Sequence, residues 1–266
     1  MTAVASAAAV CNLLLKLFQR KRRRNRLIQQ RLIPEQYRII SGSALKLIAV
    51  ITMLIDHTAS ALLRDSDIVL ITFGDKPLTL YYSMRFVGRI AFPIFAFLLA
   101  EGFVYTRNRV KYGVSLAVLA LISELPWNLV HTGTAFYSMQ NVMFTLLIGY
   151  LAMCAMEYLK DNAFALVVSI GALTAASFTL GFDYGSQGFC FIILMYLLRR
   201  LPVARAAAGI CVLPSRWVGG FAFLPIAFYS GKRGFIKGRA LKYAFYAFYP
   251  VHLLVLYFIK YFIFGR

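Results

Sequence analysis

The chain has 266 residues, of which 61% are hydrophobic and 15% charged, and its 29 Lys and Arg against 10 Asp and Glu give a formal net charge of +19. Soluble domains average about 45–50% apolar and about 25% charged residues, so the composition excludes disordered, collagenous and coiled-coil classes. A soluble nucleic-acid-binding domain is disfavoured too, because a domain of this size cannot hide so much apolar surface. A mean hydropathy of +0.70 with surplus basic charge instead predicts an integral membrane protein with basic loops.

The N-terminal region combines an apolar stretch at 3–18 with a basic run at 20–26. A signal peptide has the opposite order, with its basic residues first. The stretch is also shorter than the roughly 20 residues that a membrane span needs, so we expect an interfacial helix, with a signal-anchor as the alternative. A basic run beside a membrane is typical of a cytoplasmic anchor that faces anionic lipid. Residues 1–40 are therefore predicted to be a basic arm, and 41–266 the transmembrane domain.

Apolar segments of helical length fill the rest of the chain, and the fold class predicted is all-α, a polytopic transmembrane helix bundle. The expected spans, with approximate bounds, are 44–63, 86–105, 113–131, 141–159, 163–181, 188–200 and 243–264. Residues 64–84 are expected to form a loop. The stretch 203–230, interrupted by Pro and Gly, holds either one span at 216–230 or a hairpin made of 204–213 and 216–230. The total is about eight to nine membrane segments.

Basic residues in the loops indicate the orientation, because cytoplasmic loops carry an excess of Lys and Arg. The loops 106–112, around Lys160 and 199–205 are basic and are expected in the cytoplasm. The loops 64–84, 132–140 and 182–187 carry few basic residues and are expected outside. The basic loop 231–242 reaches the cytoplasm only if 204–230 forms the hairpin, which we therefore prefer.

The first span carries the sharpest polar pattern, with Lys46 and His57 eleven positions apart. At about 100° per residue the two side chains fall within about 20° of one face, and about 16 Å apart along the axis. This geometry suits a long anionic ligand that enters from the cytoplasm. The alternative is a buried His bonded across helices and a snorkelling Lys. Asp56 projects about 100° away from His57, so a role for it involves another helix.

The second span places Arg85 and Arg89 on one face, followed by Pro93, which should kink the helix and free a carbonyl. Arg89 either lines a cavity or neutralises a buried carboxylate. The later spans add Glu124 before a second expected proline break, Asn141 at a polar helix entry, and His252 after Pro250. Ionisable residues inside spans cost roughly 2.5–3.5 kcal/mol each and usually mark function.

Motifs for common cofactors are absent from the sequence. It contains no GxGxxG, Walker A, HExxH or GxSxG pattern, and its four cysteines, at 11, 154, 190 and 211, have no metal-binding spacing. No metal site is expected, and catalysis would rest on His, carboxylate, Arg and hydroxyl groups.

Eight sequence landmarks occur in order between about 44 and 254: LKLIAVITMLIDH, GRIAFPIFAFLLAEGF, YTRNRVKY, ISELPWNL, QNVMFTLLIG, DYGSQG, YSGKRG and KYAFYAFYPVHLL. With them the chain resembles the TraX family of bacterial membrane proteins, known for N-acetylation of conjugative pilin. That family is similar to the membrane acyltransferase-3 group, whose first span carries an Arg/Lys-x10-His motif. Lys46 and His57 have that form.

The resemblance implies an acetyl-CoA-dependent acetyltransferase in the bacterial inner membrane, with His57 as base or acyl relay. Arg89 and Asn141 are candidates to stabilise negative charge on the carbonyl oxygen, and Asp56 and Glu124 are further catalytic candidates. Candidates for contact with coenzyme A are Lys46, Arg107, Lys111, Lys232, Arg233, Lys242 and His252. The expected partners are membrane lipid, acetyl-CoA and an acceptor such as a pilin N-terminus, a glycan or a small amine.

Two other functions compete with this hypothesis. Broken helices with buried charges also occur in small-molecule transporters, although no inverted repeat is evident in this sequence. The pilus association of the resembling family favours a non-catalytic assembly factor, although the loops are short for a docking surface.

Overall fold

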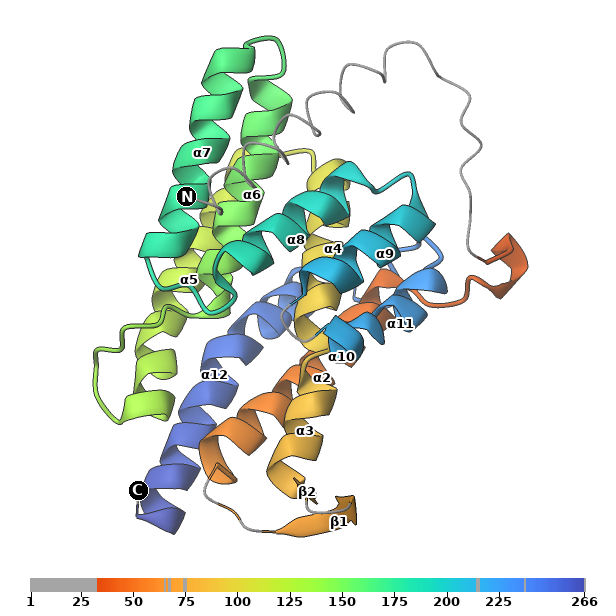
Figure 1. Ribbon diagram of the computed structural model, residues 1–266. Helices are drawn as coiled ribbons and strands as arrows, with labels where there is room; N and C mark the ends of the chain where they lie inside the picture. Colours follow the sequence, from red (N-terminus) through yellow and green to blue (C-terminus); the bar gives the residue numbers. More distant parts are fainter. Residues whose placement is uncertain are drawn as a thin grey trace.

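The computed structural model describes residues 33–64, 66, 68–73, 76–213, 216–236 and 238–265. The expected interfacial helix at 3–18 and the basic run at 20–26 lie outside the described residues. The helices and strands, in chain order, are the short 3-10 helix η2 (Glu35–Tyr37), α2 (Gly42–Leu62), β1 (Val69–Phe73), β2 (Lys76–Thr79), α3 (Leu80–Gly88), α4 (Ala91–Tyr105), α5 (Arg109–Thr132), α6 (Val142–Tyr158), α7 (Ala163–Thr179), α8 (Gly185–Leu197), α9 (Pro202–Val212), α10 (Arg216–Gly220), α11 (Phe223–Ala227) and α12 (Arg239–Phe264) (Figure 1).

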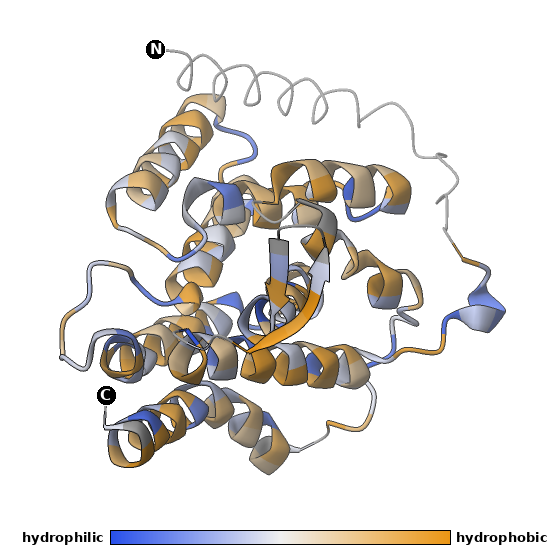
Figure 2. Ribbon diagram, turned by 60° about the horizontal axis from the view of Figure 1, so that its bottom comes forward, coloured by the Kyte–Doolittle hydropathy of each residue, from blue (hydrophilic) through white to orange (hydrophobic). Residues whose placement is uncertain are grey.

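The predicted all-α membrane bundle is confirmed. Within the described part of the chain, four helical stretches are long and apolar enough to cross a membrane: Gly42–Leu62, Leu80–Tyr105, Arg109–Thr132 and Ala240–Ile263. Shorter apolar helices accompany them between residues 142 and 227. Hydrophobic residues make up most of the helices, and several of the connections are hydrophilic (Figure 2). Large hydrophobic side chains such as Leu121, Phe164 and Phe262 are exposed on the helices. Such a surface fits lipid, which supplies the apolar contacts that water cannot.

Polar side chains fix where five of the helices begin. Each accepts a hydrogen bond from a backbone N–H in the first helical turn, which satisfies a donor that has no partner within the helix. These capping residues are Ser41 for α2, Thr79 for α3, Asn108 for α5, Asn141 for α6 and Asn162 for α7.

The predicted kink in the second span is present, and it divides the span into α3 and α4 at residues 89–90. Pro93 has no N–H to donate to the carbonyl of Arg89, four residues earlier, so the helix breaks there. The other expected break is wrong, because α5 runs from Arg109 to Thr132 with Pro126 inside it. Helix α12 likewise continues through Pro250.

The expected loop at 64–84 is wrong in two respects. Strands β1 and β2 form an antiparallel hairpin within it, with Val69 paired to Thr79 and Ile71 to Leu78. Helix α3 then begins at Leu80, six residues before the predicted start of the second span. The run 69–72 is rich in β-branched residues, which favour a strand.

Residues 202–227 form three short helices instead of a single span at 216–230. The chain then returns to the start of α2. Gly42 donates a backbone hydrogen bond to the Lys232 carbonyl at 2.8 Å, and Ser43 to the Arg233 carbonyl at 2.9 Å. The basic loop 231–236 therefore lies at the same end of the bundle as the beginning of α2, as the preferred hairpin requires. The expected second arm of that hairpin, 216–230, is divided into α10 and α11.

Helix α4 is the centre of the core. Its Phe92, Phe97 and Phe103 are at most 2% exposed, and the helix packs against α2 and α8. Helix α7 lies at the edge of the bundle (Figure 1), with Ser177 as its buried residue. Helix α12 packs along α5 and α2, so three of the membrane-crossing helices meet around one polar site.

Candidate active site

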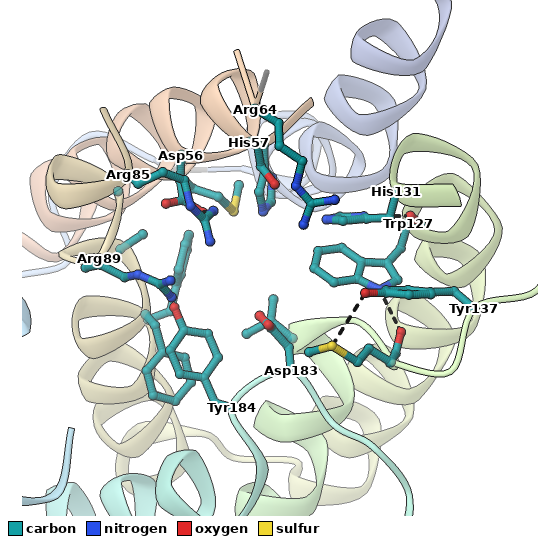
Figure 3. A pocket seen from close by; sticks show the side chains of 18 residues that line it. Asp56, His57, Arg64, Arg85, Arg89, Trp127, His131, Tyr137, Asp183 and Tyr184 are labelled. Carbon is teal, nitrogen blue, oxygen red and sulfur yellow. Dashed lines mark hydrogen bonds and ion pairs between the residues drawn. The ribbon is translucent and has the colours of Figure 1, made fainter. Parts of the chain in front are cut away.

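A cavity of about 170 Å³ lies between the C-terminal parts of α2, α3 and α5 and the first turns of α4 (Figure 3). The loop 133–141 and the residues before α8 complete its wall. Its lining residues are Met53, Asp56, His57, Ser60, Arg64, Arg85, Gly88, Arg89, Ala91, Phe92, Phe95, Trp127, His131, Tyr137, Met139, Val142, Asp183 and Tyr184. Cavities of about 150 Å³ hold a molecule the size of benzene. The site therefore suits a small reacting group.

His57 and His252 form a hydrogen-bonded pair within the membrane region. The Nδ1 atom of His57 lies 2.7 Å from Nε2 of His252, and the rings are nearly parallel, at 5°. The Nδ1 atom of His252 lies 2.8 Å from the carbonyl oxygen of Phe248. A carbonyl oxygen can only accept, so Nδ1 of His252 carries a proton, and in the neutral ring Nε2 is the acceptor. His57 therefore donates from Nδ1 and keeps a lone pair on Nε2.

Aromatic rings surround this pair. The centroids of Trp127 and Tyr249 each lie 6.1 Å from that of His57. Tyr249 is 4% exposed and His252 is 6% exposed. Close packing from α5 and α12 fixes the orientation of the His57 ring on α2, and orientation is what a proton-transfer group requires.

Asp56 pairs with Arg85 on α3, as expected for a residue that projects away from His57. Helices α2 and α3 approach closely here because residue 88 is glycine; a side chain at that position would overlap Asp56. The second carboxylate oxygen of Asp56 is buried without a hydrogen-bond partner among the described residues. Arg89 lies one turn beyond Arg85, against the hydroxyl of Tyr184. Arg85 and Arg89 form the cationic wall of the cavity (Figure 3).

The opposite wall is aromatic and consists of Trp127, His131 and Tyr137 (Figure 3). The indole N–H of Trp127 donates to the Met139 carbonyl at 2.8 Å, which ties α5 to the loop 133–141. His131 lies against Trp127, with centroids 3.9 Å apart, and stacks on Tyr137 at an interplanar angle of 5°. Sequence reasoning missed these three residues, because it assigned them to the end of a span and to an outer loop.

Asp183 and Tyr184 were missed for the same reason. The segment before α8 pairs with the loop 133–141, and the backbone N–H of Asp183 donates to the Gln140 carbonyl at 3.1 Å. Tyr184 stacks on Phe92 with centroids 3.8 Å apart. Burial raises the pKa of Asp183 to about 6, against the opposing effect of Arg89. The available signal was the landmark DYGSQG, which contains both residues.

Glu124 and Asn141 are brought together but do not line the cavity, although Val142, the residue after Asn141, does. The side-chain amide of Asn141 donates to Glu124 and, at 3.0 Å, to the Ala120 carbonyl. Its oxygen accepts from the Met143 N–H and caps α6. Every polar atom of this side chain therefore has a structural partner, so a role for Asn141 in charge stabilisation does not follow from its position.

Basic side chains gather at the opposite end of α2. Arg233 and Lys242 are near enough to Lys46 for their charges to interact, and Lys232 is held there through its backbone. Arg107 and Lys111 flank the start of α5 and are exposed. His252, predicted to contact coenzyme A, lies beside His57 instead of in this group.

The three cysteines that the structure describes do not line the cavity. Cys154, Cys190 and Cys211 are free thiols. Among the residues that the structure describes, no group of His, Cys, Asp and Glu is arranged to hold a metal ion.

Comparison with known proteins gives two findings. The sequence profile of the family described as "TraX protein" matches residues 41–260. The chain is also similar to the "Probable fimbrial assembly protein FimC, serogroup H1" of Dichelobacter nodosus, with 29% identity over 248 residues that cover 81% of this chain and 94% of that protein. No solved structure matches the chain significantly.

Proposed function

This chain belongs to the TraX family, and from that premise we propose that it is a multi-pass membrane acetyltransferase. It would transfer the acetyl group of acetyl-CoA to an amine or hydroxyl acceptor in the pilus system, with a pilin N-terminus as the family expectation. The name of the fimbrial relative supports a role in pilus assembly. The bacterial inner membrane is the proposed location.

The observation that carries the proposal is the chain of hydrogen bonds from the Phe248 carbonyl through His252 to His57. It leaves the basic Nε2 lone pair on a ring that lines the cavity. An acceptor that attacks a thioester must lose a proton, and a neutral imidazole within hydrogen-bonding reach takes it. The proton then passes to the departing thiolate.

Arg89 is the proposed stabiliser of the oxyanion that develops on the carbonyl. It belongs to the cationic wall, at the break between α3 and α4. A preorganised donor in a water-poor site is among the strongest contributions to acyl transfer. The cationic end of α2, about 16 Å from His57 along the helix, is the proposed contact for the phosphates of coenzyme A.

The test uses purified protein in nanodiscs with labelled acetyl-CoA. We expect His57→Ala to lower turnover by about 10²–10⁴-fold, the usual contribution of general base catalysis, with binding of acetyl-CoA retained. Lys160→Ala, in the exposed α6–α7 loop, is the matched control. Equal turnover in wild type and His57→Ala would remove His57 as the base.

A non-catalytic assembly factor is the second candidate, favoured by the name of the fimbrial relative. It predicts that fimbriation depends on the protein but survives His57→Ala. Loss of fimbriae in that variant, at normal protein level, would favour the enzyme. No binding of acetyl-CoA by the wild type would instead favour a transporter.

A further inference from the structure

Arg64 lines the mouth of the cavity and has no hydrogen-bond or ion-pair partner in the described part of the chain. It comes directly after the end of α2 and is exposed. Figure 3 shows its guanidinium reaching toward the ring of His131. A guanidinium carries five N–H donors and no acceptor, so an unpaired one beside a cavity is open to an anionic ligand.

The two carboxylates that line the cavity belong to its other side. Asp56 pairs with Arg85, and Arg89 lies within electrostatic range of both Asp56 and Asp183. The cationic wall therefore offsets the two acidic charges. Arg64 leaves the cavity with one positive charge in excess.

Arg64, Trp127 and His131 meet at one corner of the cavity, which we call the His131 corner. Arg64 and Lys260 act electrostatically on His131, and no carboxylate among the described residues does so. Lys260, on α12, donates to the carbonyl of Val130 at 3.2 Å. The carboxyl ends of α2 and α5 attract these cations, but a helix end carries only about half a charge. Positive charge therefore remains in excess at this corner.

From this arrangement we infer that the His131 corner binds an anionic group, a carboxylate or a phosphate, which the acceptor carries beside its nucleophile. A guanidinium holds such a group through paired, charge-assisted hydrogen bonds. The proposed contact for the coenzyme A phosphates is the basic end of α2, about 16 Å from His57. The anion at the His131 corner therefore belongs to the acceptor. The inference rests on the proposed acetyltransferase function and names a feature of its acceptor.

Trp127 sets the separation between this anion and the reacting group. Its ring centroid lies 6.1 Å from that of His57 and 3.9 Å from that of His131. A single indole ring therefore separates the proposed base from the His131 corner. This spacing suits an acceptor whose acid group lies only a few bonds from its nucleophile.

Binding of an anion at the His131 corner can be read from Trp127 itself. Trp217→Phe leaves Trp127 as the one tryptophan of the chain, and its fluorescence is titrated in phosphatidylcholine nanodiscs without acetyl-CoA. The probes are propionate and propionamide, which have the same shape and differ in charge, at constant ionic strength. The variants in this background are Arg64→Gln, Arg64→Lys and the control Lys160→Gln, in the exposed α6–α7 loop.

We expect propionate to change the fluorescence saturably and propionamide to leave it unchanged. Arg64→Gln should weaken propionate binding by about tenfold to a hundredfold, since charge-assisted hydrogen bonds are lost. Arg64→Lys should keep part of the affinity because the charge remains. Lys160→Gln should bind propionate as its parent does.

Turnover then assigns the anion to the acceptor. Labelled acetyl transfer is measured with β-alanine and 3-aminopropanamide, which carry the same amine and differ in the acid group. We expect β-alanine to have the lower KM and Arg64→Gln to remove that preference. Hydrolysis of acetyl-CoA without acceptor should stay within about twofold in Arg64→Gln, because general base catalysis by His57 is untouched.

Several results would overturn the inference: no fluorescence response to propionate, an equal response to propionamide, or unchanged propionate binding in Arg64→Gln. Equal KM values for the two amines, or acetylation of neither, would remove the assignment to the acceptor. Loss of the propionate response when phosphatidylglycerol is added to the nanodiscs would assign the corner to lipid phosphate instead. A wild type that does not bind acetyl-CoA would overturn the proposed function, while the fluorescence still decides whether the anion site exists.

Discussion

At the scale of single residues, the site depends on which nitrogen of His57 carries the proton. The Phe248 carbonyl fixes the tautomer of His252, and His252 fixes that of His57. His252 thereby orients the ring of His57. Carboxylate and carbonyl oxygens commonly orient histidine rings in the same way. In the proposed reaction His252 is thus a positioning residue, while His57 is the base that takes the proton.

Replacing His252 tests this relay. We expect His252→Phe to lower turnover by about tenfold to a hundredfold, because the ring volume remains but the acceptor for the His57 N–H is lost. His252→Gln should retain more activity, since its side-chain oxygen is an acceptor of similar reach. Steady-state kinetics with labelled acetyl-CoA measure both variants, and binding of acetyl-CoA serves as the control. Equal impairment of the two, or none in either, would argue against the relay.

Individual site residues were predictable where they lie inside apolar segments. An ionisable side chain inside an apolar segment is costly in lipid, so it can be recognised from the sequence as a site candidate. This holds for His57, Asp56, Arg89 and His252. Asp183 gave no such signal, because a polar residue in a loop is ordinary. Asp183 reaches the cavity wall because its backbone pairs with Gln140. This contact joins segments that are distant in the sequence, and no local pattern predicts it.

At the scale of elements, the contact between α2 and α3 holds the charged half of the cavity. Gly88 lets the two helices approach until Arg85 meets Asp56. Burying this pair is tolerable only while the two charges compensate each other. Most of the helices were predictable from apolar runs, but α3 begins six residues earlier than the span predicted at 86–105. The hairpin β1–β2 was not predictable, because its strands have only five and four residues and lie in a segment where Asp65, Asp67 and Asp75 indicated a loop.

A methyl group at Gly88 probes that contact. We expect Gly88→Ala to destabilise the fold by about 1–3 kcal/mol through overpacking against Asp56 and to lower turnover as α3 moves. Gly171→Ala is the matched control on α7, where an added Cβ meets nothing within 4 Å, and alanine favours the helix. Thermal unfolding in detergent measures both variants. A Gly88→Ala protein as stable and active as wild type would show that α2 and α3 tolerate separation.

At the scale of the whole molecule, the two ends of the bundle differ in chemistry. Basic side chains from the start of α2, the loop 231–236 and the start of α12 collect at one end. The cavity lies toward the other end, beside the loop 133–141 and the residues before α8. This separation suits the proposed reaction, in which acetyl-CoA and the acceptor reach the protein from opposite sides of the membrane. Loop charge predicted this polarity and a hairpin at 204–230 that returns the chain to the basic end, but not the division of that stretch into three short helices.

Labelling of single cysteines tests the resulting orientation. The positive-inside rule places the α6–α7 loop in the cytoplasm and the loop 133–141 outside. With the native cysteines replaced, Ala135→Cys should react with a membrane-impermeant maleimide in intact cells, because Ala135 is exposed at the cavity end. Lys160→Cys, equally exposed at the other end, should react only after the membrane is permeabilised. The reverse pattern would place the cavity on the cytoplasmic side, and donor and acceptor would then exchange their routes.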